Sequence, residues 1–210
     1  MVKSALFLNG ECEDFETVDL KDYDLVIAVD GGAKRFLRAG LVPDLFVGDG
    51  DSLDESDLNE LKALGCEVLL FPKEKDEIDT ELALRKAIEK GAEEIDIFCW
   101  MGERLDMLLA LIYLMASLNV KVTAKSRKLI MGIVSKEAEL EANPNEKWSI
   151  VPIVGDAYGV TLKGFKYEIV GKDMPCEHPY GVSNVAVSSK VKISVERGKV
   201  AYFRWLKEPS

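Results

Sequence analysis

The chain has 210 residues, of which 48% are hydrophobic and 30% are charged, which is the composition of an ordinary globular protein rather than a disordered or fibrous one. Its formal net charge of −10 argues against a duplex nucleic-acid-binding surface, because such a surface carries a basic face. No window approaches the roughly 20 uninterrupted apolar residues that cross a membrane, and the N-terminus lacks the pattern of a signal peptide, so we expect a cytoplasmic protein.

Strand patterns and helix patterns alternate over residues 1–125. Strands are expected at 4–8, 25–29, 45–47, 67–71, 95–100 and 120–124, and helices at 33–39, 56–64, 78–90 and 105–118. A glycine follows each of the first three helix patterns, as is common at a helix C-terminus. This alternation predicts a mostly parallel sheet with flanking helices. The helix at 105–118 is largely apolar, so we expect it to be packed on both sides.

The pattern changes after Lys125. Helical periods disappear, and turn signals such as Asn143-Pro144-Asn145 separate short apolar stretches. These stretches cover residues 129–134, 138–140, 148–154, 159–162, 167–170, 185–187, 191–195 and 200–205. Their spacing predicts an antiparallel sandwich or barrel. We therefore expect an α/β domain over residues 1–125 and an all-β domain over residues 126–210.

Cysteine and histidine usage limits the chemistry that the chain can perform. No two cysteines form a C-x-x-C pair, and zinc ligation needs clustered ligands, so we expect reduced thiols rather than a metal site. The cysteines are Cys12, Cys66, Cys99 and Cys176. Because His178 is the single histidine, mechanisms that need two histidines are excluded. Catalysis must rest on carboxylates, lysine, arginine, hydroxyl groups and metal ions.

An acidic pair, Asp49 and Asp51, follows directly after a predicted strand in Gly48-Asp49-Gly50-Asp51-Ser52. Two carboxylates at this spacing can converge on Mg²⁺, which prefers oxygen ligands together with phosphate oxygens and water. The alternative interpretation is an acidic turn that caps the next helix.

Asp30-Gly31-Gly32 follows another predicted strand and precedes a helix. Its glycines allow a close approach of backbone to a ligand, and the helix N-terminus favours a phosphate. The alternative is a plain strand-to-helix turn. Neither the P-loop pattern nor G-x-G-x-x-G is present.

Two further segments place cationic side chains beside carboxylates. Lys75 and Asp79 lie in a run of charged residues. This run could bind a phosphate and a metal ion together, or it could be a solvated cap at the N-terminus of the next helix. Arg104 and Asp106 open the most apolar helix, where they form either an ordinary salt bridge or a bidentate phosphate site.

All four segments follow predicted parallel strands, so they are expected at one edge of the sheet, where such sheets bind ligands. This many carboxylates in one cleft repel one another unless cations neutralise their charge, as the cation of a Mg²⁺-nucleotide would do. The expected cleft residues are Asp30, Asp49, Asp51, Lys75, Asp79, Arg104 and Asp106.

In order and spacing, these motifs resemble the thiamine pyrophosphokinase family over almost the whole chain. They stand here as Asp30-Gly31-Gly32, Gly48-Asp49-Gly50-Asp51-Ser52, Lys75–Leu84, Gly102–Met107, Gly164–Tyr167 and Gly181–Asn184. The resemblance implies an α/β nucleotide domain followed by a β-sandwich, and homodimers with active sites between subunits. It also implies transfer of a pyrophosphoryl group from ATP to the hydroxyl of thiamine, with release of AMP.

Carried over position by position, the resemblance implies roles for individual residues. The implied catalytic carboxylates are Asp30, Asp49, Asp51 and Asp79. Of these, Asp49, Asp51 and Asp79 would bind Mg²⁺. Lys75, Arg104 and Asp106 would contact ATP. Ser183 and Asn184 would contact thiamine, although without the resemblance they read as a simple turn between strands.

The chain departs from the family pattern at several motif positions. These are Lys34 for Asn, Gly50 for Phe, Ile78 for Thr, Glu103 for Gly and Met107 for His. Such changes leave open a pyrophosphokinase for another heterocyclic alcohol, such as a hydroxymethyl-pterin. A non-catalytic nucleotide- or thiamine-binding protein is a further alternative, against which the retained carboxylates argue.

Overall fold

The computed structural model describes residues 1–13, 15–178 and 180–207. Its contacts divide the chain into two compact units, each with its own sheet structure. The first unit comprises residues 1–111 and 119–126, and the second comprises residues 112–118 and 127–210. Among the helices of the described residues, none has the length and apolar character that crossing a membrane requires.

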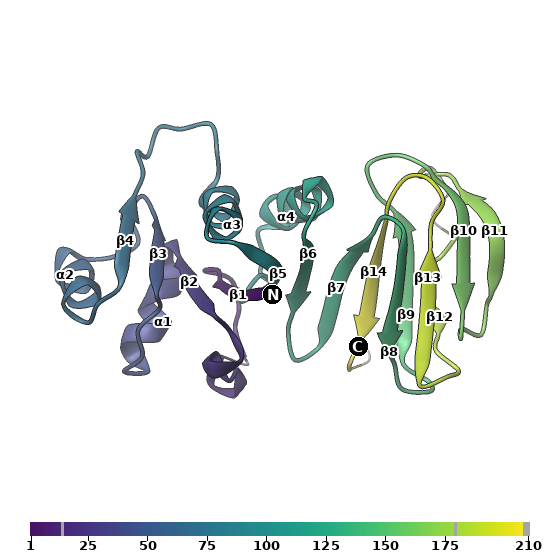
Figure 1. Cartoon of the computed structure of the whole chain (residues 1–210), viewed down its shortest axis with the longest axis horizontal. Helices are drawn as coiled ribbons and strands as arrows, with labels where there is room; N and C mark the ends of the chain where they lie inside the picture. The colour runs from purple at the N-terminus through teal and green to yellow at the C-terminus, as the bar shows by residue number, and fades with distance from the viewer. Residues whose placement is uncertain (14, 179, 208–210) are drawn as a thin grey trace. The chain divides into compact units, whose positions relative to one another are not determined.

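The first unit is built on a parallel sheet of nearly continuous apolar strands, as expected when helices bury both faces. Its strands are β1 (Val2–Phe7), β2 (Leu25–Val29), β3 (Leu45–Gly48), β4 (Glu67–Leu70), β5 (Ala92–Phe98) and β6 (Lys121–Lys125). They lie in the order β6-β5-β1-β2-β3-β4, and all of these pairings are parallel (Figure 1). The prediction of a parallel sheet is therefore confirmed.

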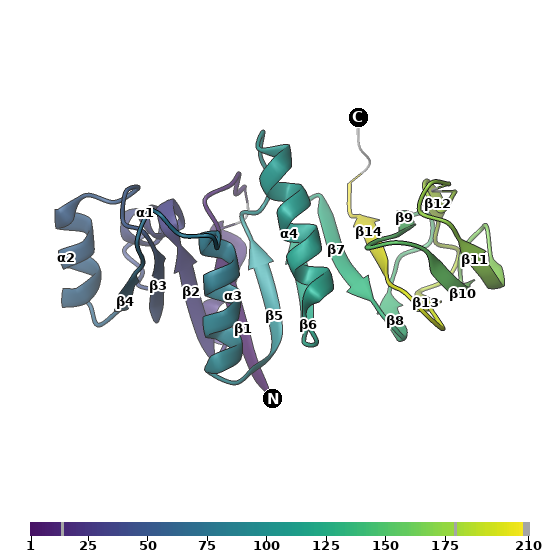
Figure 2. The same cartoon turned by 90° about the horizontal axis from the view of Figure 1, so that it is seen from above.

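Helices cover both faces of this sheet. Helices α1 (Ala33–Arg38) and α2 (Glu55–Ala63) lie on one face, and α3 (Asp79–Glu89) and α4 (Leu105–Ser117) lie on the other (Figures 1 and 2). Short 3₁₀ turns at Phe15–Thr17 and Leu20–Asp22 connect β1 to β2. Phe36 of α1 and Leu61 of α2 are fully buried against strand residues such as Phe7 and Phe46.

Helix α4 departs from its predicted burial. We expected packing on both sides, but Leu105, Leu109 and Tyr113 are exposed. These residues are four apart, so they form one stripe along the helix. The expectation was wrong because overall hydrophobicity does not show which face of a helix the chain itself covers.

The strand order reverses between β1 and β5. The chain runs outward through β1, β2, β3 and β4, and then returns to place β5 on the other side of β1. Connections from β1 and β5 therefore leave in opposite directions, which opens a crevice beyond their carboxyl ends. Open parallel sheets bind their ligands at such a point.

A buried carboxylate in β5 anchors a polar network in the first unit. Asp96 is 0% exposed. It accepts hydrogen bonds from Tyr23 Oη at 2.9 Å and from Lys125 Nζ at 2.6 Å, and Lys3 Nζ lies 3.5 Å away. Burial, followed by the charge of Asp96, raises the pKa of Tyr23 well above its ordinary value, so the phenol remains a donor.

The second unit consists of two antiparallel sheets. One has the order β12-β9-β14-β7 and the other β11-β10-β13-β8. The strands are β7 (Leu129–Val134), β8 (Glu137–Glu141), β9 (Lys147–Pro152), β10 (Ala157–Lys163), β11 (Ile169–Met174), β12 (Asn184–Val185), β13 (Lys190–Ser194) and β14 (Val200–Trp205).

The core of the second unit lies between its two sheets. Trp148 and Ile150 from one sheet share a buried cluster with Val160, Leu162 and Ile193 from the other. Buried and partly exposed residues alternate along β9, as in a strand with one face toward the core. The predicted β-sandwich is confirmed.

Candidate active site

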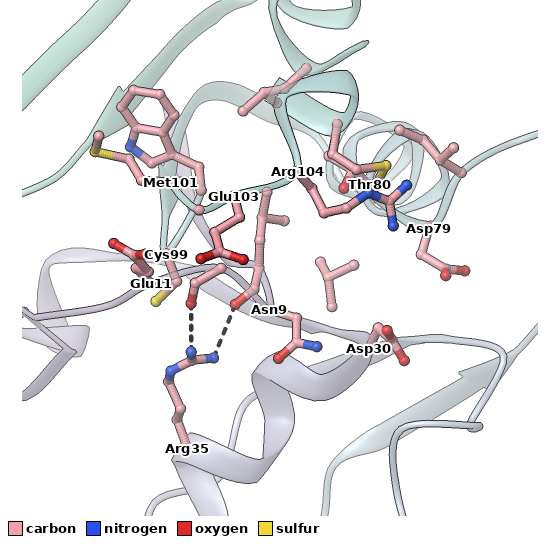
Figure 3. Close-up of a pocket in the computed structure, with 18 residues that line it drawn as sticks. Asn9, Glu11, Asp30, Arg35, Asp79, Thr80, Cys99, Met101, Glu103 and Arg104 are labelled. Carbon is pink, nitrogen blue, oxygen red and sulfur yellow. Dashed lines mark hydrogen bonds between the residues drawn. The ribbon is translucent and has the colours of Figure 1, made fainter. Parts of the chain in front are cut away.

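A cavity of about 710 Å³ opens at the strand-order reversal of the first unit. Its walls come from the segments after β1 and β5, the Asp30 turn, and the starts of α3 and α4 (Figure 3). Its polar and charged lining includes Asn9, Glu11, Asp30, Arg35, Asp79, Thr80, Glu103 and Arg104. Trp100, Met101, Met107 and Leu111 supply apolar surface. This mixture of apolar walls and a few polar groups is typical of small-molecule sites.

The turn after β2 brings a carboxylate close to the end of β1. Asp30 opens a 3₁₀ turn, Asp30–Gly32, and its φ of 49° lies in the left-handed region. A Cβ at Gly31 would collide with the side chain of Asn9, and one at Gly32 would collide with the carbonyl of Phe7. Both glycines are therefore required for the close approach that places Asp30 in the cavity wall.

Asp30, Asp49 and Asp79 form an acidic cluster. Burial is the main reason that the pKa of Asp79 is raised, and the negative charges of Asp30 and Asp49 raise it further. Lys75 Nζ lies 3.2 Å from Asp79 Oδ1 and offsets only part of this effect. Lys75 also donates to the carbonyl of Pro72 at 3.0 Å, which holds the ammonium at the start of α3.

Asp51 has a different partner from the rest of the predicted cluster. Asp49 Oδ1 accepts a hydrogen bond from the backbone N–H of Asp51 at 2.9 Å, so the two residues share a tight turn. Gly50 between them has a φ of 82°, which favours glycine. The Asp51 carboxylate is exposed and pairs with Lys73, whose pKa is raised by this contact.

Arg104 and Asp106 form a bidentate pair at the start of α4. Arg104 Nε lies 2.9 Å from Asp106 Oδ1, and Nη2 lies 2.6 Å from Oδ2. The hydrogen bonds from Arg104 lower the pKa of Asp106 to about 2. Arg104 lines the cavity and both side chains are exposed, so the guanidinium is accessible to a ligand in the cavity.

The acidic cluster fits a divalent cation. Asp30 Oδ1 is buried yet accepts no hydrogen bond, and the buried Asp79 Oδ1 has the Lys75 ammonium, at 3.2 Å, as its partner. Buried carboxylate oxygens without a donor are costly, and a hard cation satisfies them. Across the described ranges, however, no group of three or more His, Cys, Asp or Glu side chains is close enough to hold a metal by itself. Such a site suits an ion that arrives with phosphate oxygens as further ligands.

The predicted thiamine-side residues lie in the second unit and differ in exposure. Ser183 is exposed and has a φ of 61°. Asn184 is 4% exposed. Its Nδ2 donates to the carbonyl of Tyr167 at 2.9 Å, and its Oδ1 accepts from the backbone N–H groups of Tyr167 and Val185. The Asn184 side chain therefore holds the segment that presents Tyr167, while Ser183 faces solvent.

Of the predicted cleft residues, Asp30, Asp79 and Arg104 line the cavity directly, while Asp49, Asp51, Lys75 and Asp106 lie outside its lining. Sequence reasoning missed Asn9, Glu11 and Arg35. Asn9 and Glu11 follow the first predicted strand, so the strand-end rule applied to the other segments also marks them. Arg35 lies within a helix pattern, where no comparable signal marks it.

The expectation that every cysteine is a reduced thiol is wrong for one pair. Cys12 and Cys99 form a disulfide across a sequence separation of 87 residues. They follow β1 and β5, which are neighbours in the sheet, and this adjacency cannot be seen in the sequence spacing. Cys66 and Cys176 are free thiols, as expected.

Two family models match the chain. "Thiamin pyrophosphokinase, catalytic domain" matches residues 19–128, and "Thiamin pyrophosphokinase, vitamin B1 binding domain" matches residues 137–200. Together they cover most of both structural units.

Relatives and solved structures agree with these models. The chain is 29% identical over 188 residues to a thiamine pyrophosphokinase of Bacillus subtilis, covering 87% of this chain and 88% of the relative. A crystal structure of thiamine pyrophosphokinase from Bacillus subtilis is 26% identical with a TM-score of 0.84, covering 98% of this chain and 100% of that one. One from Geobacillus thermodenitrificans is 25% identical with a TM-score of 0.82, covering 100% and 99%. The chain belongs to the thiamine pyrophosphokinase family.

Proposed function

We propose that this protein transfers a pyrophosphoryl group from ATP to the hydroxyl of thiamine, giving thiamine diphosphate and AMP. The observation that carries the proposal is the buried Oδ1 of Asp30, which accepts no hydrogen bond, in the same acidic cluster as the Asp79 carboxylate. Both residues line a cavity that Arg104 also lines, with Lys75 next to Asp79. A Mg²⁺-nucleotide supplies a cation for this acidic cluster and the phosphates that the two basic side chains attract.

We assign the residue roles from the family resemblance. Asp49, Asp51 and Asp79 would hold Mg²⁺, with Asp51 exchanging its Lys73 partner for the ion. When bound, the ion neutralises charge on the phosphate oxygens of ATP. Lys75 and Arg104 bind phosphate, and Asp106 orients Arg104. Positioning and electrostatics dominate phosphoryl transfers, so the protein has little covalent chemistry to perform.

The thiamine hydroxyl must lose a proton as it attacks the β-phosphorus. Asp79 is a candidate to accept it, because its carboxylate lines the cavity beside Lys75. Asp49 is the alternative base in the same cluster. Asp30, in the cavity wall, adds negative charge that keeps the cation in place.

The two units have different tasks in this proposal. The α/β domain, residues 1–125, binds the nucleotide, and the β-sandwich domain, residues 126–210, binds thiamine through Ser183, while the Asn184 amide holds the Tyr167 segment in place. The chain acts as a homodimer with its active sites between subunits. We also place it in the cytoplasm, where its co-substrate ATP is made.

Phosphorus NMR with ATP, Mg²⁺ and thiamine tests the reaction directly. AMP and thiamine diphosphate should form together, with no ADP, because the α–β bond of ATP is the one that breaks. A parallel sample with a hydroxymethyl-pterin should give no AMP. Faster AMP release with the pterin than with thiamine would show that the pterin alcohol is the acceptor. If neither alcohol gives Mg²⁺-dependent release of AMP, the protein binds its ligands without catalysing the transfer.

Ser183→Ala is expected to raise the KM for thiamine about two- to tenfold while leaving the KM for ATP unchanged, since one ordinary hydrogen bond contributes about 0.5–1.5 kcal/mol. Ser189→Ala, an exposed serine in the same part of the chain, is the matched control and should change neither constant. Steady-state kinetics with each substrate varied in turn measures both. An effect of Ser183→Ala on ATP alone would contradict this assignment of the second unit.

Light scattering should give about twice the 23.3 kDa mass of the chain. The exposed stripe of Leu105, Leu109 and Tyr113 on α4 supports this, because contiguous exposed apolar surface is typical of protein interfaces. Leu109→Glu should lower the measured mass toward that of one chain. Leu64→Glu, at an exposed leucine just after α2, is the matched control and should leave the mass unchanged. A single-chain mass in an active wild-type preparation would contradict the dimer.

A further inference from the structure

The segment Leu8–Cys12, which we call the pocket-wall segment, forms one side of the cavity. Leu8, Asn9, Gly10 and Glu11 all line it. Backbone hydrogen bonds tie the segment to the end of β5 and the residue after it: Leu8 N–H donates to Phe98 O at 3.0 Å, and Gly10 N–H donates to Cys99 O at 2.8 Å. Glu11 forms an isolated antiparallel β-bridge with Met101, in which the backbone N–H of Glu11 donates to the Met101 carbonyl oxygen with an N···O distance of 2.6 Å.

Arg35 holds the same segment from the side of α1. Its Nη2 donates to the carbonyl of Gly10 at 2.5 Å, and its Nη1 donates to that of Leu8 at 3.4 Å (Figure 3). These two carbonyls belong to the residues before and after Asn9, whose side chain points toward the Asp30 turn. The position of the segment therefore decides where Asn9 and Glu11 meet a bound nucleotide.

The Cys12–Cys99 disulfide is the covalent part of this attachment. Cys99 lines the cavity, is 1% exposed and has a φ of 56°, which is an uncommon backbone conformation for a residue other than glycine. Cys12 ends the pocket-wall segment and is partly exposed. A reductant therefore reaches the sulfur of Cys12 more readily than that of Cys99.

We infer that Cys12 and Cys99 form a thiol–disulfide modification site that sets the affinity of the cavity for its nucleotide. This inference rests on the proposed function of the cavity as the ATP site. A dithiol attacks the Cys12 sulfur, forms a mixed disulfide and releases the Cys99 thiolate. The second thiol of the reductant then displaces Cys12. Overall the protein gains two electrons and two protons, and the dithiol leaves as a disulfide.

The other cysteines are poorly placed for this role. Cys66 is buried, and burial raises the pKa of its thiol to about 11, so it is rarely a thiolate. Cys176 is exposed, but its hydrogen bond to Asp156 raises its pKa, and it lies in the second unit. In a reducing compartment, a disulfide that persists in equilibrium with thiols is more often regulatory than structural.

Reduction should weaken nucleotide binding because the wall is then held only by hydrogen bonds. If the reduced segment keeps its binding position about one-fifth of the time, the apparent Kd rises about five-fold. Thiamine binding, assigned to the second unit, should not respond. This difference between the two substrates separates the inference from a general loss of stability.

The test compares wild-type protein in air-oxidised and dithiothreitol-reduced form. Calorimetric titration with Mg²⁺ and a non-hydrolysable ATP analogue should give a Kd about five-fold higher for the reduced form. Cys12→Ser should bind like reduced wild type in both conditions. Cys176→Ser is the matched control and should keep the full response to dithiothreitol. Peptide mapping of the oxidised sample should find the Cys12 and Cys99 peptides linked.

The outcomes are distinguishable. Equal Kd values in the two redox states, or no linked peptide in the oxidised sample, would overturn the inference, and the wild-type comparison gives this result even if Cys12→Ser does not fold. If the analogue Kd responds to dithiothreitol but neither state releases AMP, the redox site stands and the proposed reaction fails. AMP release with a redox-independent Kd would instead leave the reaction standing and refute the redox site.

Discussion

Asp79→Asn is expected to lower kcat at least about 100-fold, because it removes a charged metal ligand and one of the two candidate bases. A metal contributes several kcal/mol of charge stabilisation, and about 3 kcal/mol corresponds to a factor of 100. Glu74→Gln, an exposed carboxylate on the same connection, is the matched control and should keep wild-type turnover. Initial rates over a range of Mg²⁺ concentrations measure the effect. Near-normal turnover of Asp79→Asn at saturating Mg²⁺ would remove Asp79 from the mechanism.

Although Asp79→Asn should lose activity, its thermal stability should stay equal or rise. The folded protein raises the pKa of Asp79, chiefly by burial, so the ionised carboxylate is less stable there than in the unfolded chain. The resulting cost is absent below the unfolded pKa and grows as the pH rises through the folded one. At pH 7 the neutral amide that replaces the carboxylate avoids this cost, so ligand-free Asp79→Asn should have an equal or higher Tm by calorimetry. A clear drop in Tm would mean that lost activity reflects unfolding.

Asp96→Ala is expected to destabilise the protein by about 3 kcal/mol. Removing one partner of a buried ion pair costs about 3–5 kcal/mol. The lower end applies because the side chains of Lys3 and Lys125 keep 32% and 33% of their surface exposed and can reach water. Urea denaturation followed by circular dichroism gives the free energy of unfolding.

Glu94→Ala is the matched control for Asp96→Ala. Glu94 lies two residues earlier in β5 and pairs with Lys121 at 2.9 Å, but the side chain of Lys121 is 62% exposed. An exposed pair contributes about 0–1 kcal/mol, so this change should be small. Equal losses from the two substitutions would show that the Asp96 network contributes no more than a surface ion pair.

The sheet architecture was predictable because its signals are local. Strands buried on both faces are continuous apolar runs, and glycines such as Gly40 and Gly65 mark helix ends, so the element order of the first unit follows from the sequence. Asp30 and Asp79 were found because each adjoins the carboxyl end of a predicted strand or its following helix, and parallel strands collect these ends at one edge.

The remaining features depend on contacts between segments distant in the sequence. Neither the Cys12–Cys99 pair nor the Arg35 hydrogen bonds can be predicted without the order of β1 and β5 in the sheet. Likewise, Asn184 is part of a recognisable motif, but only the fold shows that its side-chain amide forms hydrogen bonds with the backbone of Tyr167. A motif therefore marked the position without distinguishing a ligand contact from support of a neighbouring segment.

Three residues assigned here to function share an uncommon backbone geometry: Asp30, Cys99 and Ser183 all have positive φ angles. Glycine would adopt that geometry without the steric cost of roughly 1–2 kcal/mol that other residues incur. A directed-evolution campaign that selects only for heat resistance should therefore enrich glycine at Asp30 and Ser183. Glycine at Cys99 would also break the disulfide to Cys12, which typically contributes about 2–4 kcal/mol, so no enrichment is expected there. The replacements at Asp30 and Ser183 would delete a carboxylate or a hydroxyl group, so a thermostable library of this enzyme must be screened for turnover at every round.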